Sequence, residues 1–305
     1  MPASPLHAPV LAWYDTAARD LPWRRPGTAP WAVLVSEIML QQTPVARVLP
    51  AWQAWMDRWP TPADLAAAEP GEAVRQWGRL GYPRRALRLH EAATAVVERH
   101  GGQVPADHEA LLALPGVGSY TAAAVASFAF GGRHAVVDTN VRRVHARAVS
   151  GRAEPAATLN AAETRVAHSL VPDDAATAAR WAVAVMELGA LVCTARVAHC
   201  EPCPIRHLCA WRAAGSPPSP LPARRAQTYA GTDRQARGRL LAVLRESPGP
   251  VDRAALDAVW DDAPQRRRAL AGLVADGLVE LLPGSLYRLP AGAGDSTGVA
   301  RRSLG

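Results

Sequence analysis

Leu114-Pro115-Gly116-Val117-Gly118 joins two segments with helical periodicity, and this stretch decides the fold of the 305-residue chain. Its two glycines permit a tight turn whose backbone N–H groups open a helix at Ser119, and such a turn can bind an anion. The pattern alone is weak, because many helix hairpins use glycine. Asp138 strengthens it, since one intervening helix would return the chain and bring this carboxylate near the turn.

The four cysteines of the chain form a second concentrated feature. They lie within one short window with the spacing Cys-x6-Cys-x2-Cys-x5-Cys, at Cys193, Cys200, Cys203 and Cys209. Four thiolates this close can converge on a 4Fe–4S cluster or on a tetrahedral zinc ion. Two disulfides are the alternative, but nothing in the chain is typical of a secreted protein. The asymmetric spacing differs from that of common zinc fingers, so the sequence favours an iron–sulfur centre.

The charge of the chain favours a polyanionic partner. The net charge is +7, and every basic residue apart from histidine is arginine, because the chain contains no lysine. A genome-wide bias toward Arg, Ala and Pro codons would also produce this composition. The N-terminal segment lacks a signal-peptide pattern and the longest apolar stretches are too short for a bilayer, so we expect a soluble cytoplasmic protein.

The periodicity predicts a mostly α-helical protein with two parts. Apolar residues recur at helical spacing along residues 1–212, for example in 31–40, 86–99 and 120–130. A Pro-rich linker is expected over 213–233. Residues 234–290 contain three short helical patterns and two apolar runs, which predict a winged-helix-like module. The Gly- and Ser-rich stretch 291–305 is expected to be a disordered tail.

The hairpin, the downstream aspartate and the cysteine pattern occur together and in an order that resembles the helix-hairpin-helix DNA glycosylase superfamily with an iron–sulfur loop. Within it, the chain is most similar to the MutY family of adenine DNA glycosylases. The similarity covers about residues 10–210. The motifs that carry it are Leu21-Pro22-Trp23-Arg24, Ser36-Glu37-Ile38-Met39-Leu40-Gln41-Gln42-Thr43 and Leu80-Gly81-Tyr82.

The resemblance implies an enzyme that removes adenine mispaired with 8-oxoguanine or guanine. Adenine leaves readily only when protonated, and its departure creates an oxocarbenium-like sugar, so the reaction needs an acid and an anion. Glu37, in an otherwise apolar helix, is the expected acid, and Asp138 is the expected anion. Without the resemblance, a solvated helix residue and a helix N-cap would be the preferred interpretations of these two carboxylates.

Tyr120 and Asn140 are expected to position Asp138 and the attacking water. In related bifunctional glycosylases a lysine at the position of Tyr120 attacks the sugar. A chain without lysine has no side-chain amine for a Schiff base, so composition and motif both predict monofunctional hydrolysis.

The resemblance also implies residues that bind double-stranded DNA containing mispaired adenine. Gln42 would enter the duplex near the flipped base, Thr43 would contact the opposite purine, and Tyr82 would wedge between bases. The other residues expected at the adenine pocket, at the duplex or at phosphates are Trp23, Arg24, Gln41, Gly116, Gly118 and Arg196. We further expect a monomer that is associated with the nucleoid.

Two departures from the family pattern affect specificity. Val183 stands where many members have a Gln or Glu that contacts adenine, and the C-terminal segment does not resemble the usual Nudix-like reader of 8-oxoguanine. A mismatch-specific thymine or uracil glycosylase is the nearest alternative, although Gln41 and Gln42 favour adenine. A non-catalytic iron–sulfur DNA-binding regulator is the alternative from another functional class.

Overall fold

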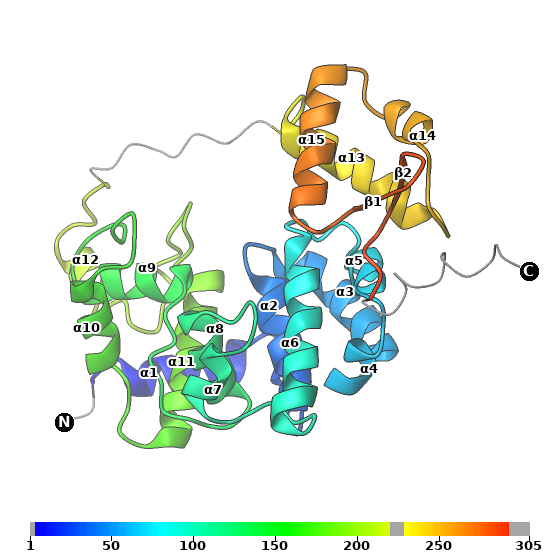
Figure 1. Ribbon diagram of the computed structural model, residues 1–305. Helices are drawn as coiled ribbons and strands as arrows, with labels where there is room; N and C mark the ends of the chain where they lie inside the picture. The colour runs from blue at the N-terminus through cyan, green and yellow to red at the C-terminus, as the bar shows by residue number, and fades with distance from the viewer. Residues whose placement is uncertain (1–3, 220–228, 293–305) are drawn as a thin grey trace, which may run out of the picture. The chain divides into compact units, whose positions relative to one another are not determined.

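The computed structural model describes residues 4–219 and 229–292, and it confirms the predicted mostly helical fold (Figure 1). The chain divides into two compact units. One comprises Met1–Glu37, Val104–Ala113 and Val117–Arg224, and the other comprises Ile38–Gln103, Leu114–Gly116 and Arg225–Gly305. Helix α2 (Pro30–Leu40) contributes residues to both units.

The core of the first unit forms where three helices that are distant in sequence pack together. Helix α11 (Ala175–Leu191) packs against α9 (Thr139–Ala148) and α1 (His7–Ala17). Val10, Val144, Trp181 and Leu188 are buried where these helices meet. Aspartate side chains cap the first-turn N–H groups of α7, α9 and α11, which explains where these helices begin. The elements are α1 (His7–Ala17), η1 (Pro22–Arg24), α7 (His108–Leu112), α8 (Ser119–Phe128), α9 (Thr139–Ala148), α10 (Ala161–Ser169), α11 (Ala175–Leu191) and α12 (Ala210–Ala213).

The second unit has its own aromatic core. Trp55 packs edge-to-face on Trp59 and Trp77, with ring centroids 4.7 and 5.7 Å apart. The helices of this unit are α3 (Val45–Arg58), α4 (Pro62–Ala66), α5 (Pro70–Trp77), α6 (Arg84–His100), α13 (Asp233–Glu246), α14 (Arg253–Asp257) and α15 (Ala263–Ala275). Helices α4 and α5 pack on α6, and α13 packs on α15 and on α5.

The C-terminal elements follow the predicted order of three helices and a hairpin. Strands β1 (Glu280–Leu282) and β2 (Leu286–Arg288) pair antiparallel, and Val251 forms a further bridge to Tyr287. Helix α14 ends at Asp257. The classification of these C-terminal elements as a winged helix stays a prediction, as do the limits of the domains and the linker. The predicted tail lies outside the described residues from 293 onward.

The glycine hairpin between α7 and α8 requires glycine at one position in particular. Gly116 has φ +75°, and a Cβ there would lie 2.7 Å from the Cβ of Arg88. Gly118 has no such restriction, and it is the N-cap of α8, which no side chain caps. The first-turn N–H groups of α8 therefore have no side-chain acceptor at the cap and can bind an anion.

In the described residues, no helix combines the length and the apolar character needed to cross a membrane.

Candidate active site

Glu37 is a buried carboxyl on the apolar helix α2. Glu37 is only 4% exposed, and its Oε2 accepts a hydrogen bond from the Tyr120 hydroxyl at 2.9 Å. Burial raises the pKa of Glu37 to about 7, although the Tyr120 hydrogen bond and the charge of Arg24 oppose the rise. The carboxyl can therefore hold or release a proton near neutral pH.

Asp138 is both the N-cap of α9 and a candidate for the anion of the reaction. One carboxylate oxygen accepts from the Val141 N–H and the other from the Asn140 side-chain amide, each at 2.7 Å. Burial raises the pKa of Asp138, and these hydrogen bonds oppose that rise by favouring the ionised form. Its charge in turn contributes to the raised pKa of Glu37. The cap interpretation and the catalytic one are thus compatible.

Tyr120 is hydrogen-bonded to Glu37 and also senses the charge of Asp138. Its hydroxyl donates to Glu37, and the Met186 sulfur lies 4.0 Å away. Burial raises the pKa of Tyr120 well above its usual value, so it remains a neutral donor. The expectation that Tyr120 positions Asp138 and the attacking water stays a prediction. The hydrogen bond adds that Tyr120 orients the candidate acid Glu37.

Arg143 was missed by the sequence analysis, and it connects the Asp138 side chain to the cysteine loop. Its guanidinium donates to Asn140 Oδ1 at 2.8 Å, to the Gly189 carbonyl at 2.6 Å and to the Cys193 carbonyl at 2.6 Å. A Cβ on Gly189 would lie 2.7 Å from that of Asn140, so this glycine allows α11 to approach α9 closely. No signal in the local sequence distinguishes the role of Arg143 from that of the neighbouring Arg142.

Trp23 and Arg24 occupy the short helix η1. Trp23 is buried, and Arg24 donates to Glu187 at 2.8 Å. Arg19 also binds both oxygens of Glu187, and these contacts outweigh burial and lower the pKa of Glu187 to about 2. Glu187 is a fully buried anion that the sequence analysis also missed.

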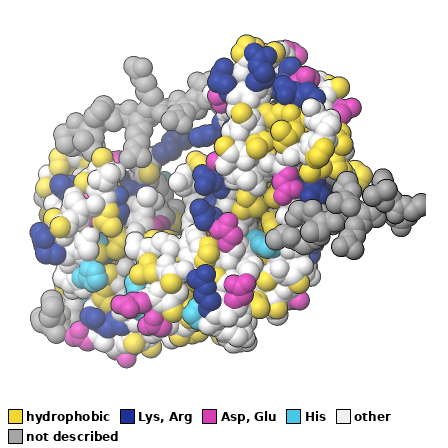
Figure 2. All heavy atoms as spheres, in the orientation of Figure 1, with side chains coloured by type: hydrophobic (Ala, Val, Ile, Leu, Met, Phe, Trp, Pro, Cys, Tyr) yellow, Lys and Arg dark blue, Asp and Glu magenta, His cyan; other side chains and the backbone are white. Residues whose placement is uncertain are grey.

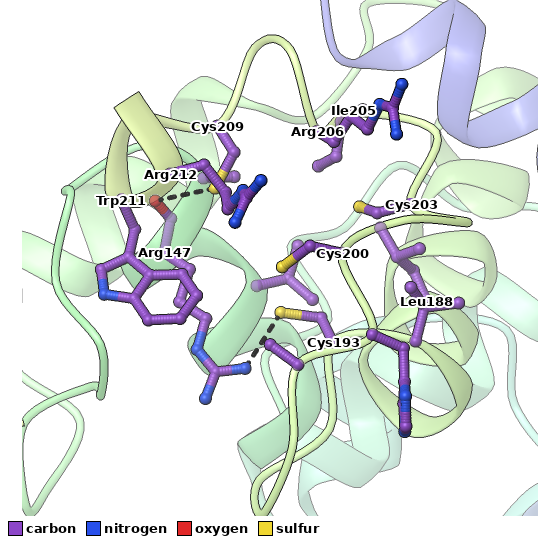
Figure 3. Close-up of a pocket in the computed structure, with 15 residues that line it drawn as sticks. Arg147, Leu188, Cys193, Cys200, Cys203, Ile205, Arg206, Cys209, Trp211 and Arg212 are labelled. Atoms are coloured by element: carbon purple, nitrogen blue, oxygen red, sulfur yellow. Dashed lines mark hydrogen bonds between the residues drawn. The ribbon is translucent and has the colours of Figure 1, made fainter. Parts of the chain in front are cut away.

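All four cysteines line one pocket, together with apolar residues and Arg147 (Figure 3). The cysteines form no disulfides. Arg147 donates to the Cys193 sulfur at 3.3 Å, and its guanidinium lies over the Trp211 ring. Over the described ranges, no three His, Cys, Asp or Glu side chains are close enough to hold one metal ion. The four thiols share one pocket.

Two residues expected to enter DNA have an unusual backbone conformation. Gln42 has φ +56° and Tyr82 has φ +47°, and both side chains are exposed. Non-glycine residues rarely adopt this left-handed region, and such strain concentrates at functional positions. Gln41 is half-buried, whereas Thr43 is buried and its hydroxyl accepts a hydrogen bond from Arg85 at 2.9 Å.

Arg85 holds the two loops that carry these residues, and the sequence analysis missed it. One guanidinium nitrogen donates to the carbonyls of Ile38, Met39 and Gln41, and the other donates to Thr43 Oγ1 and to the Gly81 carbonyl. A single side chain thus ties the end of α2 to the Gly81-Tyr82 turn. Burial lowers the pKa of Arg85 to about 10, so it stays charged.

We expect Arg85→Ala to destabilise the protein by about 2–3 kcal/mol, because several buried carbonyls lose a charged donor. Arg85→Lys should recover only part of this loss, since an ammonium group cannot reproduce the planar fork. Arg88→Ala, on the same helix and paired with Glu91 at the surface, is the control and should cost less than about 1 kcal/mol. Urea unfolding measures all three, and equal losses for Arg85→Ala and Arg88→Ala would contradict the assigned role.

Arg196 is exposed in the cysteine loop, where a phosphate could reach it. Arg206, by contrast, is engaged by Glu201 at 2.7 Å. Two exposed features of the first unit are thus candidate phosphate contacts. They are the first-turn N–H groups of α8 after Gly118 and the side chain of Arg196.

Comparison with known proteins shows the superfamily to which the chain belongs. Residues 35–167 match the HhH-GPD superfamily of base excision DNA repair proteins. A solved thermostable thymine-DNA glycosylase has 31% sequence identity and a TM-score of 0.60, over 68% of this chain and 94% of that one. A structure of an endonuclease III–DNA complex shares the fold, with a TM-score of 0.57 at 24% identity.

Curated relatives define the family within this superfamily. An adenine DNA glycosylase of Mycolicibacterium smegmatis is 54% identical over 288 residues, which is 94% of this chain and 96% of the relative. One of Mycobacterium tuberculosis is 56% identical over 282 residues, or 92% of each chain. The human adenine DNA glycosylase is 46% identical over 209 residues. The chain belongs to the adenine DNA glycosylase family.

Proposed function

We propose that this protein removes adenine from DNA in which it is mispaired with 8-oxoguanine or guanine, by hydrolysis of the N-glycosidic bond. The observation that carries the proposal is the buried Glu37, whose pKa of about 7 suits a general acid and whose Oε2 accepts a hydrogen bond from Tyr120. Family membership supports the same activity. The resemblance of the Gln41, Gln42 and Thr43 motif supports adenine as the base.

In the proposed mechanism, protonated Glu37 delivers a proton to a ring nitrogen of adenine. The base then leaves as a neutral molecule, and the bonding electrons of the glycosidic bond depart with it. Asp138 faces positive charge developing on the deoxyribose, and its ionised form is favoured by the Val141 and Asn140 donors. Water adds to the sugar, and a neighbouring carboxylate accepts its proton.

Strand cleavage through a Schiff base is not part of the proposal. The chain contains no lysine, so only the α-amino group could act as an amine nucleophile. The enzyme therefore stops at the abasic site, which another activity must process.

The test is single-turnover excision on duplexes that contain A:8-oxoguanine, A:G or T:G pairs. Release of adenine from either adenine duplex, with little borohydride-trapped adduct, supports the proposal. Release of thymine from T:G in preference would favour the alternative thymine or uracil glycosylase, which the similarity to a thymine-DNA glycosylase keeps open. Binding of all three duplexes without excision would favour the non-catalytic regulator.

We also propose that Cys193, Cys200, Cys203 and Cys209 hold a 4Fe–4S cluster. Each cysteine of such a cluster binds a different iron, so the sulfurs line a pocket and need not surround one point. A tetrahedral zinc ion, with four sulfurs about 2.3 Å from its centre, is the alternative, and the asymmetric cysteine spacing favours the cluster over it. The bound cluster would act as a structural cross-link, and Arg143 and Arg147 would then hold the loop through Cys193.

We expect about four irons per chain in protein purified under anaerobic, iron-sufficient conditions, as this stoichiometry follows from the cluster. Cys200→Ser should lower the iron content and the midpoint of thermal unfolding, because one bond of the cross-link is lost. Metal analysis and calorimetry measure both quantities. One zinc and no iron per chain would contradict the assignment.

A further inference from the structure

Tyr82 has a second arginine beside its ring, and that arginine comes from the C-terminal elements. The ring is 49% exposed, and its centroid lies 5.5 Å from the Arg85 guanidinium carbon and 5.9 Å from that of Arg234. Arg234 lies in the first turn of α13. An exposed aromatic ring flanked by cations is a combination that nucleic acids use, because bases stack on the ring and phosphates bind the cations.

Arg234 differs from most arginines of the module formed by α13–α15 and β1–β2. Figure 2 shows basic side chains gathered over the part of the molecule that carries α13 and α15. Several are already neutralised: Arg237 pairs with Asp276, Arg266 with Asp257, and Arg268 with Asp233. Arg234 is exposed and forms no ion pair with any residue in the described ranges. Its charge is therefore available to a ligand.

The first turn of α13 is held near Tyr82 by an ion-pair bridge. Asp276, at the end of α15, accepts from Arg237 of α13 and from Arg84 of α6, the latter at 3.3 Å. Arg84 follows Tyr82 by only two residues in the chain. The bridge thus joins the module to the turn that carries the exposed ring.

The opposite end of α13 is fixed by backbone contacts. Arg75 of α5 donates to the carbonyls of Leu244, Arg245 and Ser247, which belong to the last turn of α13 and the residue that follows it. Arg245 returns a hydrogen bond to the Val74 carbonyl at 2.9 Å. The Gly71 N–H donates to the Pro290 carbonyl at 2.7 Å, where any larger residue would clash. The module is consequently docked at both ends of α13.

We propose that Arg234 binds a backbone phosphate of the DNA strand into which Tyr82 inserts, so that the module is a fixed part of the DNA-binding surface. The contact is made by the first turn of α13, because Arg234 lies beside the Tyr82 ring, whereas Arg266 and Arg268 of α15 are held by aspartates. The proposal rests on the proposed function, because it assumes that Tyr82 meets DNA.

The test uses the full-length protein and a duplex with an uncleavable 2′-fluorinated deoxyadenosine opposite guanine or 8-oxoguanine. Binding is measured between 50 and 200 mM salt. Arg234→Ala should weaken binding roughly three- to tenfold at the lowest salt and reduce the slope of log K against log salt by about one, the value of one phosphate contact. Arg234→Lys should keep the slope.

Arg239→Ala is the matched control, because Arg239 is an exposed arginine on the same helix that lines a separate hollow with Trp260 and Gln265. It should change neither quantity. An Arg234→Ala protein with unchanged slope and affinity would overturn the inference. A weaker affinity with an unchanged slope would also overturn it, since that result reports a displaced Tyr82 and no lost phosphate. Failure of the wild type to release adenine from natural duplexes would instead refute the proposed function.

Discussion

Replacing Glu37 with glutamine is expected to slow adenine release by about 10²–10⁴-fold in single turnover, the range that general acids contribute. Glutamine can still accept the hydrogen bond from Tyr120, but it carries no acidic proton. Duplex binding should therefore be retained. Release of adenine at a near-normal rate would show that another group supplies the proton.

The wild-type rate should also depend on pH in a defined direction. Because the raised pKa of Glu37 is about 7, the protonated fraction falls above that value, and the excision rate should fall with it. At acid pH the rate should fall again as Asp138, whose pKa is raised from 3.8, becomes protonated. Glu98→Gln, which changes an exposed carboxylate on α6, should leave the profile unchanged and serves as the control.

Stability provides an independent readout of the same carboxyl. Unfolded chains ionise Glu37 near 4.5, whereas the folded protein retains its proton to about 7. The unfolded state thus loses its proton first, and the wild type should lose roughly 1.4 kcal/mol of unfolding free energy per pH unit between these values, relative to Glu37→Gln. The contribution is fully present below 4.5 and is lost by about 7. Parallel stability curves for the two proteins would mean that Glu37 is not desolvated.

Asp138→Asn is expected to reduce excision by about 10²–10³-fold or more, because it removes the charge that faces the sugar cation. Asparagine is as good an N-cap as aspartate, so the Val141 N–H keeps its acceptor and α9 should persist. Thermal unfolding should change little, in contrast to the rate.

Asp107→Asn and Asp174→Asn are matched controls, because these residues cap α7 and α11 in the same way. Both variants should excise adenine at the wild-type rate. If all three variants lost activity equally, or if only Asp138→Asn lost its fold, Asp138 would be a structural cap without a separate part in the reaction.

The positions of helices could be read from the chain, because their signals are local. Helical spacing placed residues 31–40 within 1 residue of the observed α2 (Pro30–Leu40), and Gly116 marked a turn whose φ of +75° excludes other residues. The cysteine spacing indicated a common site, and the four side chains line one pocket. The helical periodicity of the C-terminal segment also predicted α13 and α15. The absence of lysine by itself excludes a Schiff base on a lysine side chain.

Only the tertiary structure decided the properties that depend on desolvation and on contacts distant in sequence. Glu37 looks like any helical glutamate until burial beside Tyr120 raises its pKa. The sequence does not distinguish Arg85 from the other arginines of its segment, whereas the structure surrounds its guanidinium with five acceptors. Arg234 likewise lies beside Tyr82 only because the ion pairs of Asp276 join the C-terminal helices to α6. Local patterns carry no information about how much water a folded chain removes from a charge. They likewise cannot say which distant side chain replaces that water. The sequence by itself therefore determined the helical elements and the grouping of the cysteines, while the folded arrangement determined which charges are available for chemistry.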